Sequence, residues 1–134
     1  MRAWADVHLL VCDDDASVRL AVRTFLTRQL GCTVTECASG YDALEVIQQR
    51  ETHGVILDLQ MPELDGLQTL QILQKLPTPP PVLVLTDDRR ETMVRQALAL
   101  GACDYLGKPP KPDALVNRVR RMMTRYEWRQ TPVG

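Results

Sequence analysis

The chain has 134 residues, 45% of them hydrophobic, which suits one folded domain with a substantial core and leaves no room for a second domain. With 16 basic and 17 acidic residues the formal net charge is −1, so no overall field favours direct contact with nucleic acid or an anionic membrane. No apolar stretch is long enough to span a bilayer and the N-terminus lacks a signal-peptide pattern, so we expect a cytoplasmic protein without membrane contacts.

Apolar runs typical of buried strands alternate along the chain with segments that are apolar at helical spacing. The expected strands are the runs 8–12, 33–37, 55–57, 82–85 and 105–106. The expected helices follow them in turn: one capped by Asp15 and closed by Gly31, one introduced by Ser39 and Gly40, one beginning at Asp65, one over 91–100 and one over about 113–126. Strand and helix in regular alternation predict an α/β fold, with one parallel sheet covered on both faces.

Four cysteines stand at positions 12, 32, 37 and 103. The first and last lie in or beside apolar strand runs, where a free cysteine behaves as a small hydrophobe. The other two have a spacing that matches no common zinc pair. We therefore expect buried, reduced thiols.

Polar residues stand at or just past the ends of four of the expected strands. They are Asp13 and Asp14, then Asp58, Thr86 and Lys108. If the strands are parallel, these side chains gather at one edge of the sheet, which is where open α/β sheets bind ligands.

Three converging carboxylates repel one another unless a cation or protons offset their charge. Mg²⁺ is the natural partner, because it prefers one or two carboxylates together with water and phosphate oxygens. A lysine ammonium and a threonine hydroxyl nearby could hold a phosphoryl group. Such a set can accept a phosphoryl group on one aspartate, giving a short-lived acyl phosphate that suits signalling better than storage.

From about residue 7 to 127 the chain resembles the receiver domain of bacterial two-component response regulators. The matching motifs are Leu9-Leu10-Val11-Cys12-Asp13-Asp14-Asp15, Val55-Ile56-Leu57-Asp58-Leu59-Gln60-Met61-Pro62, Leu64-Asp65-Gly66, Leu83-Val84-Leu85-Thr86 and Asp104-Tyr105-Leu106-Gly107-Lys108-Pro109. The resemblance implies a flavodoxin-like, doubly wound sheet of five parallel strands in the order 2-1-3-4-5 with five helices. It assigns residues 1–127 to the receiver domain and leaves 128–134 as a flexible tail or the start of a linker.

The resemblance also implies roles for the acidic residues. Asp58 is the expected phosphoacceptor, taking the group from the phosphohistidine of a histidine kinase or a phosphotransfer protein. Asp14 is expected to bind Mg²⁺ directly, Asp13 largely through water, and Gln60 through its backbone carbonyl. The protein would then be a phosphorylation-activated switch with weak self-phosphatase chemistry, rather than a turnover enzyme.

The remaining family positions concern how the phosphoryl group is sensed. Thr86 would hydrogen-bond it, Lys108 would pair with it, and Tyr105 would turn inward when the threonine moves. The peptide bond between Lys108 and Pro109 is expected to be cis, as it usually is in the family.

Two residues near the site, Asp87 and Pro110, depart from the family pattern. Asp87 stands where the family has a small residue, and we hypothesise that its carboxylate slows phosphorylation. Asp88 occupies a position that modulates self-dephosphorylation in the family, and Pro110 makes a second proline after Lys108, with no predicted effect.

Two other functions stay open at this point. A receiver-like docking module that is never phosphorylated would explain Asp87. A phosphatase of the haloacid-dehalogenase type, with Asp13 as nucleophile, would explain the run from Asp13 to Ser17, although the chain is short for a substrate pocket. The effector is not readable, and a homodimer through the fourth helix, fifth strand and fifth helix is a further possibility. His53 lies in a polar loop and is expected to be solvated without a role.

Overall fold

In the computed structural model of the chain, residues 3–87 and 91–130 are described, with backbone alone for 126–130. A 3-10 turn at Trp4–Asp6 precedes alternating strands and helices. These are β1 (His8–Cys12), α1 (Ala16–Leu30), β2 (Thr33–Cys37), α2 (Gly40–Gln49), β3 (Gly54–Leu57), α3 (Gly66–Gln74), β4 (Val82–Thr86), α4 (Glu91–Ala99), β5 (Asp104–Gly107) and α5 (Pro112–Gln130).

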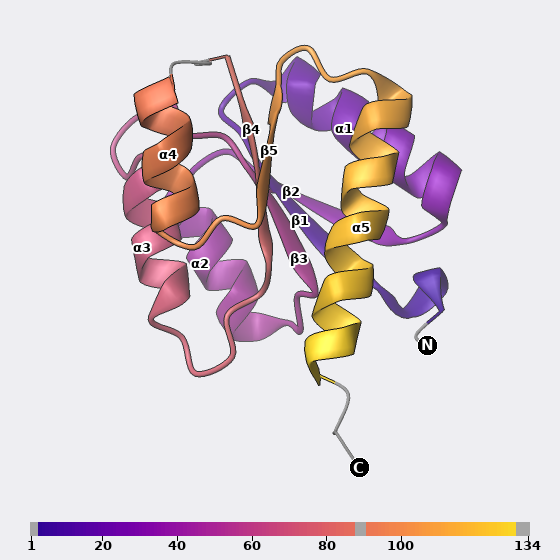
Figure 1. The fold of residues 1–134 in the computed structure, drawn as a ribbon. Helices are drawn as coiled ribbons and strands as arrows, with labels where there is room; N and C mark the ends of the chain where they lie inside the picture. The colour runs from indigo at the N-terminus through magenta and orange to yellow at the C-terminus, as the bar shows by residue number, and fades with distance from the viewer. Residues whose placement is uncertain (1–2, 88–90, 131–134) are drawn as a thin grey trace.

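The strands form one parallel sheet in the order β2-β1-β3-β4-β5, which confirms the predicted topology (Figure 1). The central pair β1 and β3 is in register from Leu9 opposite Gly54 to Cys12 opposite Leu57. The chain places β2 on one side of β1 and then adds β3, β4 and β5 on the other side. The carboxyl ends of β1 and β3 therefore open a crevice at this switch point.

The helices begin and end where the sequence places its caps. The Asp15 side chain accepts a hydrogen bond from the Ser17 N–H at 2.8 Å, and Gly31 ends α1 with a left-handed φ of 78°. Asp65 and Gln68 form a reciprocal capping box at the start of α3. Local chemistry therefore fixes how these helices leave the sheet edge that carries the polar residues.

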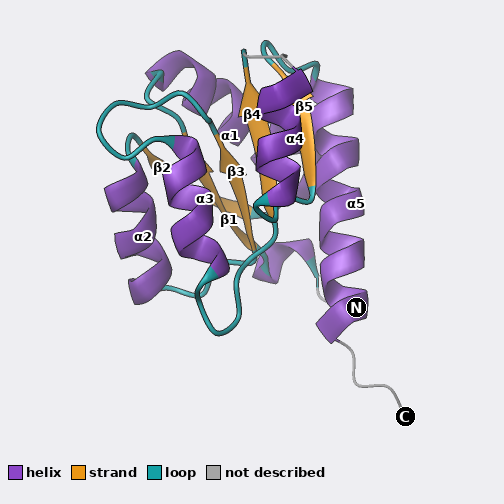
Figure 2. Cartoon of the chain, turned by 60° about the vertical axis from the view of Figure 1, so that its left-hand side comes forward, coloured by secondary structure: helices purple, strands orange, loops and turns teal. Residues whose placement is uncertain are grey.

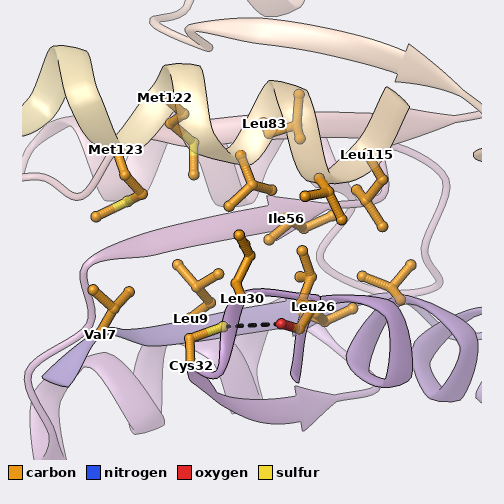
Figure 3. Packing of buried hydrophobic residues seen from close by; sticks show 14 of the residues in the cluster. Val7, Leu9, Leu26, Leu30, Cys32, Ile56, Leu83, Leu115, Met122 and Met123 are labelled. Carbon is orange, nitrogen blue, oxygen red and sulfur yellow. Dashed lines mark hydrogen bonds between the residues drawn. The ribbon is translucent and has the colours of Figure 1, made fainter. Parts of the chain in front are cut away.

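Helices cover both faces of the sheet. Figure 1 shows α1 and α5 on one side and α2, α3 and α4 on the other, and Figure 2 shows the second group from the front. The α1 and α5 side is packed around Leu9, Leu26, Ile56, Leu83 and Leu115, all at most 1% exposed (Figure 3). Within the described residues, no helix combines the length and hydrophobicity needed to cross a membrane.

All four cysteines are free thiols. Cys12, Cys32 and Cys37 are buried as predicted, whereas Cys103 is only partly buried. Cys32 donates to the Leu26 carbonyl at 3.7 Å in the core (Figure 3). Burial raises the pKa of Cys37 to about 11, so this thiol stays protonated at neutral pH.

The predicted end of the last helix was wrong. Helix α5 continues through Gln130, past the expected end at Tyr126 and into the predicted tail. The helix extends past Tyr126 because residues 127–130 contain neither proline nor glycine, so no residue there favours ending the helix. Residues 131–134 lie outside the described part of the chain, as does Asp88.

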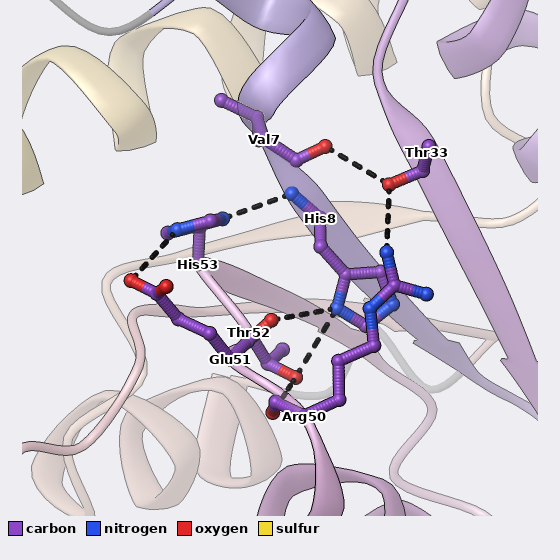
Figure 4. Close-up of polar contacts among 7 residues, drawn as sticks. All are labelled: Val7, His8, Thr33, Arg50, Glu51, Thr52 and His53. Atoms are coloured by element: carbon purple, nitrogen blue, oxygen red, sulfur yellow. Dashed lines mark hydrogen bonds and ion pairs between the residues drawn. The ribbon is translucent and has the colours of Figure 1, made fainter.

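The prediction that His53 is solvated was also wrong, because its ring is buried with 5% exposure. Its Nδ1 accepts a hydrogen bond from the His8 N–H at 2.9 Å, and its Nε2 lies 3.1 Å from a Glu51 carboxylate oxygen (Figure 4). The polar neighbours suggested a solvated loop, but a neutral imidazole can complete the hydrogen bonding of a buried strand end.

Candidate functional site

The polar residues after the strands are held by continuations of the sheet's hydrogen bonding. The Asp13 N–H donates to the Cys37 carbonyl at 3.0 Å, and the Asp58 N–H donates to the Cys12 carbonyl at 2.9 Å. The Lys108 N–H donates to the Thr86 carbonyl at 3.1 Å. Each functional side chain therefore stands on a backbone that the neighbouring strand fixes, which brings the residues from four strands to one edge.

Three carboxylates meet at this edge. Oxygen atoms of Asp13, Asp14 and Asp58 all lie within 4.8 Å of one another. Asp13 and Asp58 are almost fully buried, with 1% and 2% exposure, whereas Asp14 is exposed. The cluster therefore has an inner wall of two buried carboxylates and an outer carboxylate that faces solvent.

The Lys108 ammonium bridges the two buried carboxylates. Its Nζ lies 2.6 Å from Asp13 Oδ2 and 3.3 Å from Asp58 Oδ2. Burial alone would lower the pKa of Lys108, but hydrogen bonding and charge from the two carboxylates outweigh it and raise the pKa above its usual value. The lysine is thus a fixed positive charge between the two carboxylates.

Asp58 is less acidic than an ordinary aspartate. Burial raises its pKa to about 6, and the charge of Asp13 adds to this, while the Gln60 amide and Lys108 act in the opposite direction. The Gln60 N–H donates to Asp58 Oδ1 at 3.1 Å. At neutral pH most molecules still have an ionised Asp58, with its oxygens directed by one amide and one ammonium.

The donor set fits Mg²⁺. Three carboxylates and one ammonium leave a net charge of −2, and hard oxygen ligands are those that Mg²⁺ prefers. Asp13 Oδ2 is buried and, among the described residues, has no hydrogen-bond partner apart from its ion pair with Lys108. A divalent cation held by these carboxylates and the Gln60 carbonyl would balance the charge.

The loop after β3 ends at Gly66, and it approaches the backbone of Asp58 so closely that a side chain at this position would not fit. A Cβ atom on Gly66 would lie 2.2 Å from the Asp58 carbonyl oxygen, and the Gly66 N–H instead donates to the Leu59 carbonyl at 3.0 Å. The glycine in the Leu64-Asp65-Gly66 motif therefore permits the loop to fold back over the phosphoacceptor candidate.

The remaining sequence-predicted residues lie around this centre. Thr86 is 1% exposed at the end of β4, while Tyr105 on β5 is 40% exposed. The peptide bond between Lys108 and Pro109 is cis. Thr86 is therefore buried at the edge of the sheet that carries the aspartates, whereas Tyr105 is partly exposed.

A cleft of about 680 Å³ opens over the acidic cluster. Its lining combines charged groups, among them Asp14, Asp58 and Lys108, with residues of α1 and the two prolines after Lys108. Asp15 and the exposed Asp87 also line the cleft, so four carboxylates face the same space.

Sequence reasoning missed Arg19. Its Nη1 donates to the Asp13 carbonyl at 2.6 Å, and its side chain is only 17% exposed. The available signal was its position one helical turn after the Asp15 cap, which places it over the end of β1. Sequence alone does not say whether such an arginine points back toward the strand or outward.

A family model described as the response regulator receiver domain matches residues 9–120. The chain therefore belongs to the receiver domain family of two-component response regulators. Its members are signalling domains controlled by phosphorylation, not turnover enzymes, and this confirms the resemblance seen in the motifs.

Curated relatives and a solved structure support the assignment. Transcriptional activator protein ExaE of Pseudomonas putida is 32% identical over 94% of this chain and 59% of its own length. Response regulator MprA of Mycobacterium ulcerans is 37% identical over 89% of this chain and 51% of its own. The receiver domain of the Francisella response regulator 1452 matches with a TM-score of 0.81 and 31% identity, covering 90% of this chain and 98% of that domain. The chain thus spans between half and three fifths of these curated relatives.

Proposed function

We propose that this domain is a Mg²⁺-dependent switch in which Asp58 accepts a phosphoryl group from a phosphohistidine of a histidine kinase or phosphotransfer protein. The observation that supports this most directly is the position of Asp58. It is a buried carboxylate 3.3 Å from the Lys108 ammonium and close to two further carboxylates, open to a cleft.

The transfer step uses groups that are already in place. A carboxylate oxygen of Asp58 attacks phosphorus, the bond between phosphorus and the histidine nitrogen breaks, and the imidazole leaves with the electron pair. Lys108 can neutralise a phosphoryl oxygen as charge redistributes. Mg²⁺ held by Asp13, Asp14 and the Gln60 carbonyl would supply further charge neutralisation.

Phosphorylation replaces the ion pair between Lys108 and Asp58 by one between Lys108 and the phosphoryl group. In the proposed switch, the Thr86 hydroxyl turns to donate to the new group, and Tyr105 moves inward from its exposed position. Both movements would shift a pre-existing equilibrium between two surfaces of the domain. The acyl phosphate is then lost slowly by hydrolysis, with Asp87 and Asp88 as candidate modulators.

The extent and the partners of the domain are also proposals. We take residues 1–127 as the receiver, with the end of α5 leading into a tail or linker, and we propose a cytoplasmic location. The effector is a separate protein or an attached domain, in keeping with relatives of whose length the match covers 59% and 51%. The face of α4, β5 and α5 is a candidate for homodimer contacts.

One alternative has a specific observation in its favour. Asp87 adds a fourth carboxylate to the cleft, which opposes entry of an anionic phosphoryl donor. A receiver-like docking module that is never phosphorylated would tolerate this charge.

Intact mass after incubation with Mg²⁺ and acetyl phosphate tests the proposal. We expect wild type to gain the mass of one phosphoryl group and Asp58→Asn to gain none. A folded wild-type protein that gains no mass under these conditions would support the docking module instead.

A further inference from the structure

We propose that Arg19 is a positioning residue for magnesium binding, because its guanidinium holds the peptide unit that joins Asp13 to Asp14. This inference rests on the proposed function, since it concerns the same metal site. Among the described residues, Arg19 contacts the Asp13 carbonyl and Glu36, and it does not line the cleft.

The contacts of Arg19 join three elements. From the first turn of α1, its Nη1 donates to the Asp13 carbonyl at 2.6 Å, just past the end of β1. Its Nε lies 3.5 Å from a carboxylate oxygen of Glu36 on β2. Because a guanidinium is planar and rigid, anchoring one edge on Glu36 fixes the direction in which the other edge donates.

The hydrogen-bonded carbonyl has a special place in the site. It belongs to the peptide plane between Asp13 and Asp14, so rotation of this plane would turn both residues relative to one another. The side chain of Asp13 is already held at both oxygens, by the Asp15 N–H at 2.9 Å and by Lys108 at 2.6 Å. Asp14 is exposed, so the backbone is what restrains its direction.

A neighbouring arginine offers a matched control. Arg23 lies one turn further along α1 and pairs with the other oxygen of Glu36 at 2.8 Å. Among the described residues, the arginine that donates to the Asp13 carbonyl is Arg19. Replacing Arg23 by glutamine therefore removes a positive charge and a Glu36 ion pair while leaving the bond to the Asp13 carbonyl in place.

Charge and positioning predict opposite signs for the same substitution. If Arg19 acted only as a charge, its removal would make the acidic site more negative and strengthen Mg²⁺ binding. If it positions the peptide plane, its removal lets Asp13 and Asp14 depart from the binding geometry and weakens Mg²⁺ binding. Loss of outer contacts of this kind typically lowers metal affinity by about 10- to 100-fold.

The test is Mg²⁺ titration by calorimetry of wild type, Arg19→Gln, Arg19→Lys and Arg23→Gln, each first shown to be folded by circular dichroism. We expect Arg19→Gln to bind Mg²⁺ about tenfold more weakly than wild type. Arg23→Gln should bind as tightly as wild type or slightly more tightly. Arg19→Lys keeps the positive charge but loses the planar guanidinium, so we expect it to bind Mg²⁺ about as weakly as Arg19→Gln.

The outcomes separate this inference from the proposed function. If wild type binds no Mg²⁺, the proposed function itself fails. If wild type binds and Arg19→Gln binds equally well or better, the positioning role is overturned while the switch stands. Equal weakening in Arg19→Gln and Arg23→Gln would likewise overturn it, because the effect would then follow Glu36 and not the Asp13 carbonyl.

Discussion

Buried titratable side chains lie at both ends of the sheet, but their charges are balanced in different ways. At the carboxyl ends of the strands, Asp13, Asp14, Asp58 and Lys108 leave a net charge of −2. At the opposite end, the donors and acceptors of the two histidines are matched within the chain. His53 accepts from the His8 backbone, and the His8 ring lies 3.0 Å from the Glu51 carbonyl (Figure 4). The other ring nitrogen of His8 lies 2.7 Å from the Thr35 hydroxyl.

Burial of a polar group therefore does not by itself identify a functional site in this protein. At the histidine end each ring nitrogen of His8 and His53 has a partner within the chain, which is what a buried structural network needs. The acidic end is incomplete, because the chain supplies one cation for three carboxylates. What distinguishes the two ends is the charge left over after all internal contacts have been made.

The largest effect is expected at the acidic end, from Lys108→Met. Removing the ammonium leaves Asp13 and Asp58 buried without their counter-charge and removes a contact to the phosphoryl group. We expect phosphorylation by acetyl phosphate to slow by about 10²- to 10³-fold and the free energy of unfolding without Mg²⁺ to fall by about 3 kcal/mol. Mass spectrometry and urea unfolding measure these, with exposed Lys111→Met as the control. Similar rates for both variants would contradict this role.

At the histidine end, His53→Phe should affect stability but not function. The substitution keeps a flat ring and leaves the His8 N–H without its acceptor, which costs about 1 to 3 kcal/mol. His53→Gln, whose side-chain oxygen can accept the same hydrogen bond, should lose less. Urea unfolding measures the cost, and Mg²⁺ titration should give wild-type affinity for both variants. A changed affinity would mean that the two ends are coupled.

The two ends should respond to pH in opposite directions in the metal-free protein. Burial lowers the pKa of His8 below 6.5, so its contribution to stability is complete above pH 6.5 and is lost as the pH falls through the folded-state pKa. The pKa of Asp58 is raised from 3.8 to about 6, so protonation in the folded state stabilises the protein as the pH falls through about 6.

Unfolding free energies between pH 7 and pH 5 can therefore separate the two ends. Asp58→Asn removes the stabilising protonation, so we expect its stability to fall more steeply with acid than that of wild type. His8→Gln should show the opposite change. Parallel curves for wild type and Asp58→Asn would show that Asp58 titrates as an ordinary aspartate.

The smallest effect is expected from Asp87→Ala. Removing an exposed carboxylate from the cleft should speed phosphorylation by about two- to fivefold, because charge interactions near solvent are weak. Glu45→Ala on α2 changes the net charge equally but lies away from the cleft, so its rate should match wild type. No acceleration in Asp87→Ala would remove the proposed inhibitory role.

Much of the acidic end could be predicted because it depends on local patterns. Apolar runs that each finish in a polar residue define the strands and place Asp13, Asp58, Thr86 and Lys108 at their ends, and parallel pairing then brings these ends together. The caps at Asp15 and Asp65 were equally readable, since a helix start satisfies its own N–H groups with nearby side chains.

The contacts of Arg19, His8 and His53 could not be predicted in the same way. Each contact depends on where a long or aromatic side chain points. Its partner lies in another element or loop of the fold, and residue spacing does not determine whether the side chain points toward that partner. The predicted end of α5 failed for a related reason, because lack of apolar periodicity does not stop a helix without a proline or glycine.

The sequence by itself therefore determined the strands and helices, the family and the set of charged residues. These follow from hydrophobic periodicity and from the motifs. Only the tertiary structure decided how charge is distributed among them. It paired Lys108 with two of three carboxylates, raised the pKa of Asp58 by burial and gave each ring nitrogen of the two histidines a hydrogen-bond partner. The physical reason is that desolvation and hydrogen-bond geometry depend on which groups meet in space, and this is settled only when the sheet and its helices have packed.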